Sequence, residues 1–224
     1  MRNTMMVLGA VALGSAGAGA NAGGGTGTSA ARADETAGPA AKRSTHPVSR
    51  LFLDEHVLGP GKVTLEAVAA AHARDLATQG KHGVAFRAYW VDAQSGTIRC
   101  LVEAPTAEAV NHVHEEAHGL LAGKIVPVSG DNLDWAPAPG RKLYLDVHHL
   151  GPGKVTPEAL AGAHAKDLAA QGKHGVRYLN YWFDAATGTV RCLIEAPSAQ
   201  AALDVHQEAH GLMPDSITEV SEGR

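Results

Sequence analysis

Apolar and polar positions along the chain follow one order of patterns, and this order occurs twice. In its first occurrence residues 51–56 predict a strand that ends at a Gly-Pro-Gly turn. A helix is predicted to begin after Thr64, a favourable N-cap residue, and to run to about Gln79. Gly80 is expected to stop this helix. The pattern therefore opens with a strand followed by a helix.

The second half of this unit predicts a hairpin, a helix and a short strand. Residues 84–92 and 97–103 are predicted strands joined by a short turn. A helix is expected to open at Pro105-Thr106 and to end near His118, and a final strand covers 125–128. The order βαββαβ is that of a ferredoxin-like split βαβ domain. The predicted fold class is therefore α+β.

Residues 51–128 recur as residues 143–220, an offset of 92 positions. About 49 of the 78 aligned positions are identical. A repeat of this length indicates two whole domains in tandem rather than a solenoid of short units. Each domain alone would expose one apolar face of its sheet to water. Packing the two faces together removes them from water. We therefore expect an intramolecular pseudo-dimeric αβ-barrel.

Trp90 and Trp182 are expected to help fill the space between the two sheets. Strand alternation divides the first strand of the second repeat into two faces. We expect the face with Leu143, Leu145 and Val147 to meet the helices. The face with Tyr144, Asp146 and His148 is then expected to point away from them.

Composition shifts divide the chain into five segments. Residues 1–22 resemble an export signal with a small-residue cleavage site, which favours a secreted or cell-envelope protein; a cytoplasmic protein with a disordered tail is the alternative. Residues 23–48 are expected to form a disordered linker. Repeat 1 then covers 49–128, a second linker covers 129–141, and repeat 2 covers 142–220. The apolar run near the start is too short to predict a membrane span.

Charge and composition argue against nucleic acid as a partner. The formal net charge is -4, the pI is about 6.3 and aromatic residues make up 4% of the chain. Nucleic-acid binders usually carry a basic stripe, often with aromatic platforms for bases. Cys100 and Cys192 occupy equivalent positions, one in each repeat, so neither repeat can form an internal disulfide. We expect both to be small buried residues in strands.

Histidines account for most of the polar residues that the two repeats share. His72 and Asp75 are expected on the inner side of one helix, and His114 and His118 have the i, i+4 spacing with which two imidazoles can ligate one metal ion. A single inward histidine is usually a hydrogen-bonded core residue, but several in one small domain are costly to bury without partners. We therefore predict a divalent metal site in each repeat. Its candidate ligands are His56, His72, Asp75, His82, His114 and His118 in repeat 1, and His148, His149, His164, Asp167, His174, His206 and His210 in repeat 2.

His56 leaves two arrangements open. Strand alternation places it on the face away from the helices, whereas helix periodicity places His72 and His114 on the helix side. The histidines would then serve two sites. Alternatively, His56 lies beyond the regular strand, where alternation no longer applies, and joins the helix histidines in one site.

Several blocks of the sequence resemble the small nickel-binding ferredoxin-like domain family. They are Asp-x-His-His at 146–149, His-Ala-x-Asp-Leu-Ala at 164–169, Gln-Gly-Lys-His-Gly-Val at 171–176, Cys-Leu-x-Glu-Ala-Pro at 192–197 and Val-His-x-Glu-Ala at 205–209. The fourth residue of the first block, His149, is replaced by Val57 in repeat 1, and His112 stands where repeat 2 has Asp204. The resemblance implies a dimeric αβ-barrel that binds nickel ions, and it covers both repeats.

Imidazole and carboxylate ligands without thiolate suit Ni²⁺, Zn²⁺, Cu²⁺ or Co²⁺ rather than Ca²⁺ or Mg²⁺. The resemblance favours nickel among them. The predicted function is thus the binding and sequestration of a divalent transition metal, and the resemblance implies no established catalytic reaction. The alternative is an enzyme that binds a small organic substrate in the cleft between helices and sheet and uses a histidine as general base.

Overall fold

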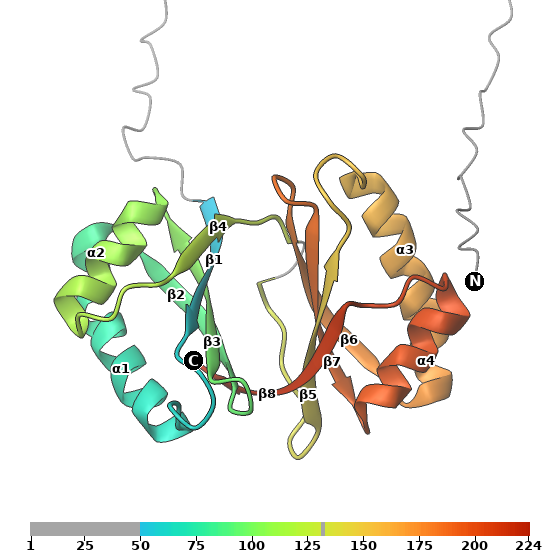
Figure 1. The fold of residues 1–224 in the computed structure, drawn as a ribbon. Coiled ribbons are helices and arrows are strands. Elements are labelled where there is room, and N and C mark those ends of the chain that lie inside the picture. Colours follow the sequence, from blue (N-terminus) through green and yellow to red (C-terminus); the bar gives the residue numbers. More distant parts are fainter. Residues whose placement is uncertain (1–49, 131–132) are drawn as a thin grey trace, which may run out of the picture. The chain divides into compact units, whose positions relative to one another are not determined.

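The computed structural model describes residues 50–130 and 133–224. The predicted export signal at 1–22 and the predicted linker at 23–48 lie outside the described residues. The rest of the chain falls into two halves that correspond to the two repeats (Figure 1).

Each half has the predicted βαββαβ order. Repeat 1 contains β1 (Arg50–Val57), α1 (Leu65–Thr78), β2 (Ala85–Asp92), β3 (Thr97–Ala104), α2 (Ala107–Ala117) and β4 (Lys124–Pro127). Repeat 2 contains β5 (Lys142–His149), α3 (Pro157–Ala170), β6 (Arg177–Asp184), β7 (Thr189–Ala196), α4 (Ala199–Ala209) and β8 (Ser216–Gly223). The two helices of each half cover the outer face of its strands (Figure 1).

The start of α1 at Leu65 and its end at Thr78 are as predicted, but Gly80 is not the residue at which the chain turns. Thr64 is the N-cap, and its hydroxyl accepts a hydrogen bond from the backbone N–H of Ala67 at 3.2 Å. Gly80 lies within a 3₁₀ turn, η1 (Gln79–His82), that follows α1 directly. The chain reverses at Gly83, whose φ of +64° is in the left-handed region.

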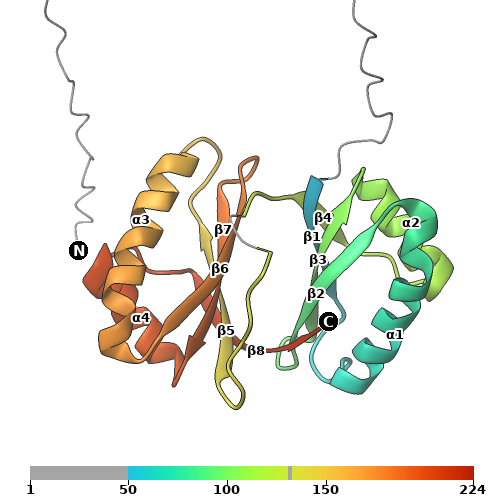
Figure 2. The ribbon, with the colours of Figure 1, turned by 180° about the vertical axis from the view of Figure 1, so that it is seen from behind.

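The strands form one sheet in the order β4-β1-β3-β2-β8-β5-β7-β6. The last strand of repeat 2 reaches across to repeat 1, because Ser221 of β8 pairs with Val91 of β2 (Figure 2). At the opposite seam Ser129 pairs with Phe183 of β6, and both backbone hydrogen bonds of this bridge are 2.9–3.0 Å long. These two pairings are equivalent under the 92-residue offset. They close the sheet into a pseudo-dimeric αβ-barrel.

Trp90 and Trp182 pack against each other inside the barrel, with ring centroids 4.7 Å apart. Trp135, from the predicted linker 129–141, packs against both at 5.7 Å and is 5% exposed. Glu222 of β8 accepts hydrogen bonds from the indole N–H groups of Trp90 and Trp135 at 2.9 and 2.8 Å. This part of the linker is therefore a component of the core that joins the halves.

The predicted faces of β5 are reversed. Leu143 and Leu145 lie in the barrel core with the tryptophans, whereas Tyr144 packs in the core between sheet and helices. Asp146 and His148 share the helix-facing side, so the prediction that they point away from the helices is wrong. The apolar side of the strand is needed in the barrel interior, and the polar side is tolerated beneath the helices because helix α4 supplies a histidine to it.

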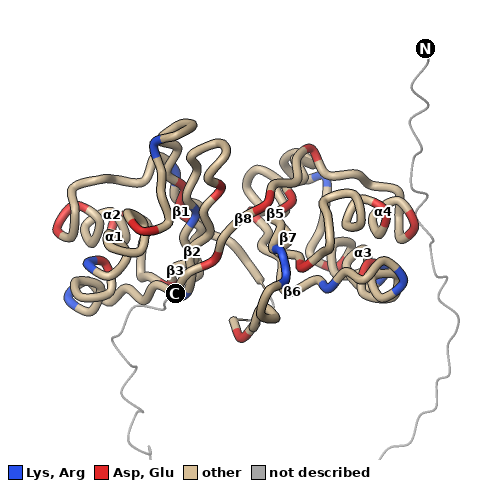
Figure 3. The backbone as a smooth tube through the Cα atoms, turned by 90° about the horizontal axis from the view of Figure 1, so that it is seen from below, with Lys and Arg blue, Asp and Glu red and all other residues tan. Residues whose placement is uncertain are grey.

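Acidic and basic residues are distributed over both halves (Figure 3). Within the described residues no helix combines the length and apolar character needed to cross a membrane. The helices have 11 or 14 residues.

Candidate metal centre

Three buried side chains meet between β1 and α2 in repeat 1. Asp54 and His56 are two residues apart on β1 and therefore point to the same side of the sheet. Asp54 Oδ2 lies 3.1 Å from Nε2 of His114 on α2, and Asp54 Oδ1 lies 3.8 Å from Nε2 of His56. The rings of His56 and His114 are 4.9 Å apart. All three residues are at most 5% exposed, and each has a ligand atom within 4.8 Å of the others'.

His114 also joins a second group. Its Nδ1 atom lies 3.1 Å from Asp75 Oδ1 on α1, and Nε2 of His118 lies 3.1 Å from the same oxygen. His114 therefore stands between two carboxylates, with Asp54 at one ring nitrogen and Asp75 at the other. Of the two arrangements left open for His56, the one that placed it on the opposite face from His114 is wrong, because the polar side of β1 faces the helices. His56 does join the helix histidines, but it lies within β1 rather than beyond it.

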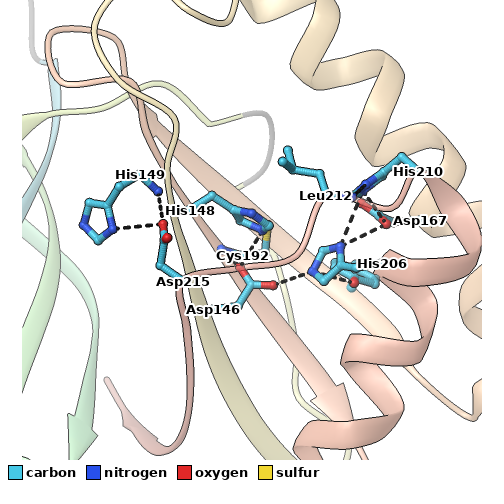
Figure 4. A network of polar contacts seen from close by, with 10 residues as sticks. Asp146, His148, His149, Asp167, Cys192, His206, His210, Leu212 and Asp215 are labelled. Carbon is cyan, nitrogen blue, oxygen red and sulfur yellow. Dashed lines mark hydrogen bonds and ion pairs between the residues drawn. The ribbon is translucent and has the colours of Figure 1, made fainter. Parts of the chain in front are cut away.

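Repeat 2 reproduces this arrangement (Figure 4). Nε2 of His206 lies 2.8 Å from Asp146 Oδ2, and Nε2 of His148 lies 3.7 Å from Asp146 Oδ1. Asp167 Oδ1 lies 3.3 Å from Nδ1 of His206 and 3.1 Å from Nε2 of His210. Repeat 2 differs at one point, since the hydroxyl of Tyr178 contacts His206 Nε2 at 3.2 Å. The equivalent residue in repeat 1 is Phe86.

His114 and His206, each of which lies between two carboxylates, hold their protons tightly. Burial by itself lowers the pKa of His114, but its hydrogen bonds to Asp54 and Asp75 outweigh burial and raise this pKa to about 9. His206 follows the same balance with Asp146 and Asp167, and its pKa is also about 9. Burial lowers the pKa of His56 and His148, with partial compensation from Asp54 and Asp146. Neutral His56 and His148 therefore lie beside cationic His114 and His206.

A backbone hydrogen bond defines the tautomer of His118. The N–H of Leu120 donates to Nδ1 of His118 at 3.1 Å, so in the neutral ring Nε2 carries the proton and faces Asp75. The N–H of Leu212 makes the same bond to Nδ1 of His210. In the neutral ring, Nε2 of His118 is therefore a hydrogen-bond donor and has no lone pair for a metal ion. Nε2 of His210 lies 3.1 Å from Asp167 Oδ1 and also 3.4 Å from Nδ1 of His206.

His72 and His164 lie near these groups but outside them. His72 lies on α1 and its ring is 4.7 Å from the ring of Tyr89, while that of His164 is 4.8 Å from Tyr181. Neither ring nitrogen of His72 has a hydrogen-bond partner within the described part of the chain, although the residue is 4% exposed. Burial lowers the pKa of His72, so its ring is neutral.

His82 and His174 are placed on the outside of the helices. Nε2 of His82 lies 3.0 Å from Glu116 of α2, which also pairs with Lys81. In the same block the side-chain oxygen of Gln79 accepts a hydrogen bond from the N–H of Phe86 at 2.7 Å. The repeated Gln-Gly-Lys-His-Gly-Val block thus ties α1 to β2 and α2, and repeat 2 does the same through Gln171 and Glu208.

His149 likewise lies outside the clusters. It is 63% exposed, and its Nδ1 atom lies 3.2 Å from Asp215 (Figure 4). The structure does not bring it near His206. Repeat 1 has Val57 at this position, so the two clusters are built without it.

The sequence profile of the SCO4226-like nickel responsive protein family matches residues 52–128 and 144–220. Together these segments exceed half of the chain. The chain belongs to this family. It carries two copies of the family's domain, which the structure shows paired in one barrel.

Two solved structures illustrate what the chain is similar to. SCO4226 from Streptomyces coelicolor A3(2) is 40% identical over 34% of this chain and 93% of its own, with a TM-score of 0.33. A chlorite dismutase from Candidatus Nitrospira defluvii is 9% identical over 80% of this chain and 92% of its own, with a TM-score of 0.45. Both superpositions are weak, so neither determines the function of this chain. No curated protein matches the chain.

Two carboxylates were missed as candidate ligands in this nickel responsive family domain. Asp54 and Asp146 are fully buried, and each contacts two histidines. The available signal was their position two residues before His56 and His148, since that spacing puts both side chains on one side of a strand. The reversed assignment of the strand faces hid this relationship.

Proposed function

We propose that the protein binds and sequesters Ni²⁺, with one ion in each repeat. The ligands in repeat 1 are Asp54, His56 and His114, and those in repeat 2 are Asp146, His148 and His206. The observation that carries this proposal is the recurrence of a buried Asp-His-His group in both halves, at matching positions and nearly matching distances. Membership of the nickel responsive family supports the choice of metal.

The donor set fits a divalent transition ion. Nδ1 of His56 and of His148 is buried and has no hydrogen-bond partner in the described parts of the chain. A buried nitrogen without a partner is costly, and a metal ion bound by this nitrogen would remove that cost. Burial raises the pKa of the thiols of Cys100 and Cys192, which keeps them protonated and leaves imidazole and carboxylate as the donors.

His114 can bind only one ion in its neutral form, because a neutral imidazole has one nitrogen free to accept. Asp75 accepts a hydrogen bond from the N–H at Nδ1 of His114 and thereby fixes the orientation of the ring. Nε2 is then the ligand atom, on the side of Asp54 and His56. This division follows the usual pattern in which a metal-bound histidine donates its other N–H to a carboxylate. Nε2 of His118 contacts the same oxygen of Asp75 at 3.1 Å and helps to hold this carboxylate in place.

Metal uptake at these sites would release protons. His114 and His206 are cationic at neutral pH, since their pKa is about 9, and each must lose its Nε2 proton before that atom can bind an ion. The carboxylates of Asp54 and Asp146 remain as negative charges beside the incoming cation. Such a site suits reversible sequestration that responds to both metal concentration and pH.

Stoichiometry measured on untagged protein tests the proposal. After dialysis against Ni²⁺ and elemental analysis, the wild type should hold two ions per chain, His114→Ala one, and the double variant His114→Ala with His206→Ala none. The matched control is His82→Ala with His174→Ala, which removes two histidines that pair with surface glutamates. This control should still hold two ions.

Two results would contradict the proposal. One is a double variant that remains folded and still binds two ions; the other is a loss of nickel from the His82 and His174 control. Parallel dialysis against Zn²⁺ and Co²⁺ tests the choice of metal, whereas Cu²⁺ binds most nitrogen and oxygen sites more tightly than Ni²⁺ and does not discriminate. Tighter retention of Zn²⁺ or Co²⁺ than of Ni²⁺ under competition would overturn the assignment to nickel.

A further inference from the structure

Repeat 1 contains a cavity that repeat 2 largely lacks. The cavity lies between α1, α2 and the sheet and has a volume of about 150 Å³, whereas its counterpart in repeat 2 has about 30 Å³. An apolar cavity of about 150 Å³ is large enough for a benzene ring. The two halves therefore differ in the space that they offer, although their histidine and aspartate positions match.

One substitution on the cavity wall accounts for part of this difference. Val68 lines the cavity in repeat 1, and its equivalent Leu160 lines the small one in repeat 2. Leu160 packs against the apolar core of its repeat. The additional methylene group extends into the space that remains open in repeat 1. The other walls of the larger cavity are mainly apolar and include Val63, Ile98 and Leu120.

The lining also includes Lys62 and the cluster residues His56, Asp75, His114 and His118. Asp75 contacts His114 and His118, whereas His72 takes no part in these contacts. His72 is 4% exposed, lines the cavity, and has no hydrogen-bond partner at either ring nitrogen within the described residues. A neutral imidazole offers one donor and one acceptor, and leaving both unused in the interior is costly. The ring of Tyr89 lies 4.7 Å from that of His72, so the polar group is set among aromatic surface.

We propose that this cavity binds a small uncharged hydroxy-aromatic molecule, with its ring against the apolar wall and its hydroxyl bonded to His72. His56 and His114, two of the proposed metal ligands, also line the cavity, but Val68 and His72 do not belong to the ligand set, so the proposal can be tested apart from nickel binding on metal-free protein. It also concerns repeat 1 alone. Occupancy by a small molecule would be the first requirement of the enzyme alternative raised by the sequence.

Phenol and benzene are the probes, applied to metal-free full-length protein in the presence of a chelator. Phenol should bind with a stoichiometry of one per chain, and benzene about tenfold more weakly, because benzene leaves His72 without a hydrogen bond. Val68→Leu should weaken binding of both, because the added methylene group narrows the cavity. Calorimetry measures these affinities, and a thermal melt confirms that the variant is folded.

The ratio of the two affinities separates a ligand-binding role of His72 from a structural one. His72→Phe should bring phenol down to the affinity of benzene, while the matched control His82→Phe should preserve the tenfold preference. Equal affinities for phenol and benzene in the wild type would overturn the proposal, as would a phenol affinity that Val68→Leu leaves unchanged. Tighter binding of benzoate than of phenol would show an anion site instead, and no binding of any probe would show a cavity that holds only water.

Discussion

Nε2 of His114 lies 3.1 Å from Oδ2 of Asp54, in a contact that joins helix α2 to strand β1 beneath the helix layer. In the metal-free protein this contact is a hydrogen bond to a cationic imidazole. In the nickel-bound protein that we propose, the same two atoms are ligands of one ion. The space between these two atoms thus holds a proton in the metal-free protein and a metal ion in the proposed bound form.

Nickel affinity should continue to rise with pH well beyond the range of an ordinary histidine. His114 and His206 have a pKa of about 9, so below that pH each ion must displace a proton. The affinity of each site should increase about tenfold per pH unit between pH 7 and 9. Competition titrations with a soluble chelator measure this slope. An affinity that levels off near pH 7 would show that these histidines are not protonated in the metal-free protein.

Stability of the metal-free protein should have the opposite dependence on pH. The folded-state pKa of His114 and His206 is raised from 6.5 to about 9, so their contribution is complete below pH 6.5 and is lost as pH rises through 9. The free energy of unfolding should fall by about 3 kcal/mol per repeat between pH 6 and 10. Urea denaturation at several pH values tests this, with the His114→Asn, His206→Asn double variant as the reference that lacks the dependence.

Asp54→Asn should weaken nickel binding in repeat 1 alone. The asparagine can still accept the hydrogen bond that Asp54 Oδ1 receives from the N–H of Cys100 at 3.1 Å, but it has no charge. We expect the affinity of that site to fall by at least about tenfold. Asp215→Asn is the matched control, since Asp215 contacts the exposed His149. Equal nickel titrations for wild type and Asp54→Asn would remove Asp54 from the ligand set.

Tyr178→Phe should strengthen nickel binding in repeat 2. The Tyr178 hydroxyl contacts the same nitrogen of His206 that we propose as a ligand atom, and an ion must displace it. Breaking one hydrogen bond costs about 1 kcal/mol, so the variant should bind about fivefold more tightly at this site. Repeat 1 offers the reciprocal change, Phe86→Tyr, which should weaken its site by a similar factor. Calorimetric titrations of both variants provide the comparison; a weaker site in Tyr178→Phe would instead identify the hydroxyl as a ligand.

Trp135→Ala should destabilise the barrel without changing nickel stoichiometry. Trp135 packs against both Trp90 and Trp182 on the interior face, while the proposed metal ligands lie on the helix-facing side. Removing a buried tryptophan typically costs about 3–5 kcal/mol. Leu133→Ala, a change at an exposed residue of the same segment, is the control and should cost less than about 0.5 kcal/mol. Urea denaturation and elemental analysis of both variants test the two parts.

The order and types of the elements could be predicted from the sequence, because helix caps such as Thr64 and the alternating strands are local signals. The paired domains followed from the duplication. The faces of β1 and β5 could not be assigned, since Leu143 and Tyr144 are both apolar enough for a core and only packing decides which core receives each. The crossing of β8 to β2 was also missed, because it depends on a pairing between residues more than 100 positions apart.

Among the candidate ligands, the histidines of α2 and α4 were identified from shared inward positions. Whether such a histidine is a proposed ligand or a supporting residue depends on a hydrogen bond from the backbone N–H of Leu120 to Nδ1 of His118. A sequence does not reveal this hydrogen bond. His82 was included among the candidate ligands because it recurs in both repeats. The recurring block instead connects α1 to α2 and β2 through hydrogen bonds. Recurrence alone does not distinguish a residue kept for chemistry from one kept for folding.

The connection of both halves through one continuous chain has a genetic consequence. In a dimer of identical subunits every mutation appears twice, so both copies of a site must tolerate it. Here each half mutates separately while β8 and Ser129 keep the halves together. Val68 opposite Leu160, and Phe86 opposite Tyr178, are such independent changes. One half is thereby free to acquire a specialised task while the other retains the ancestral one.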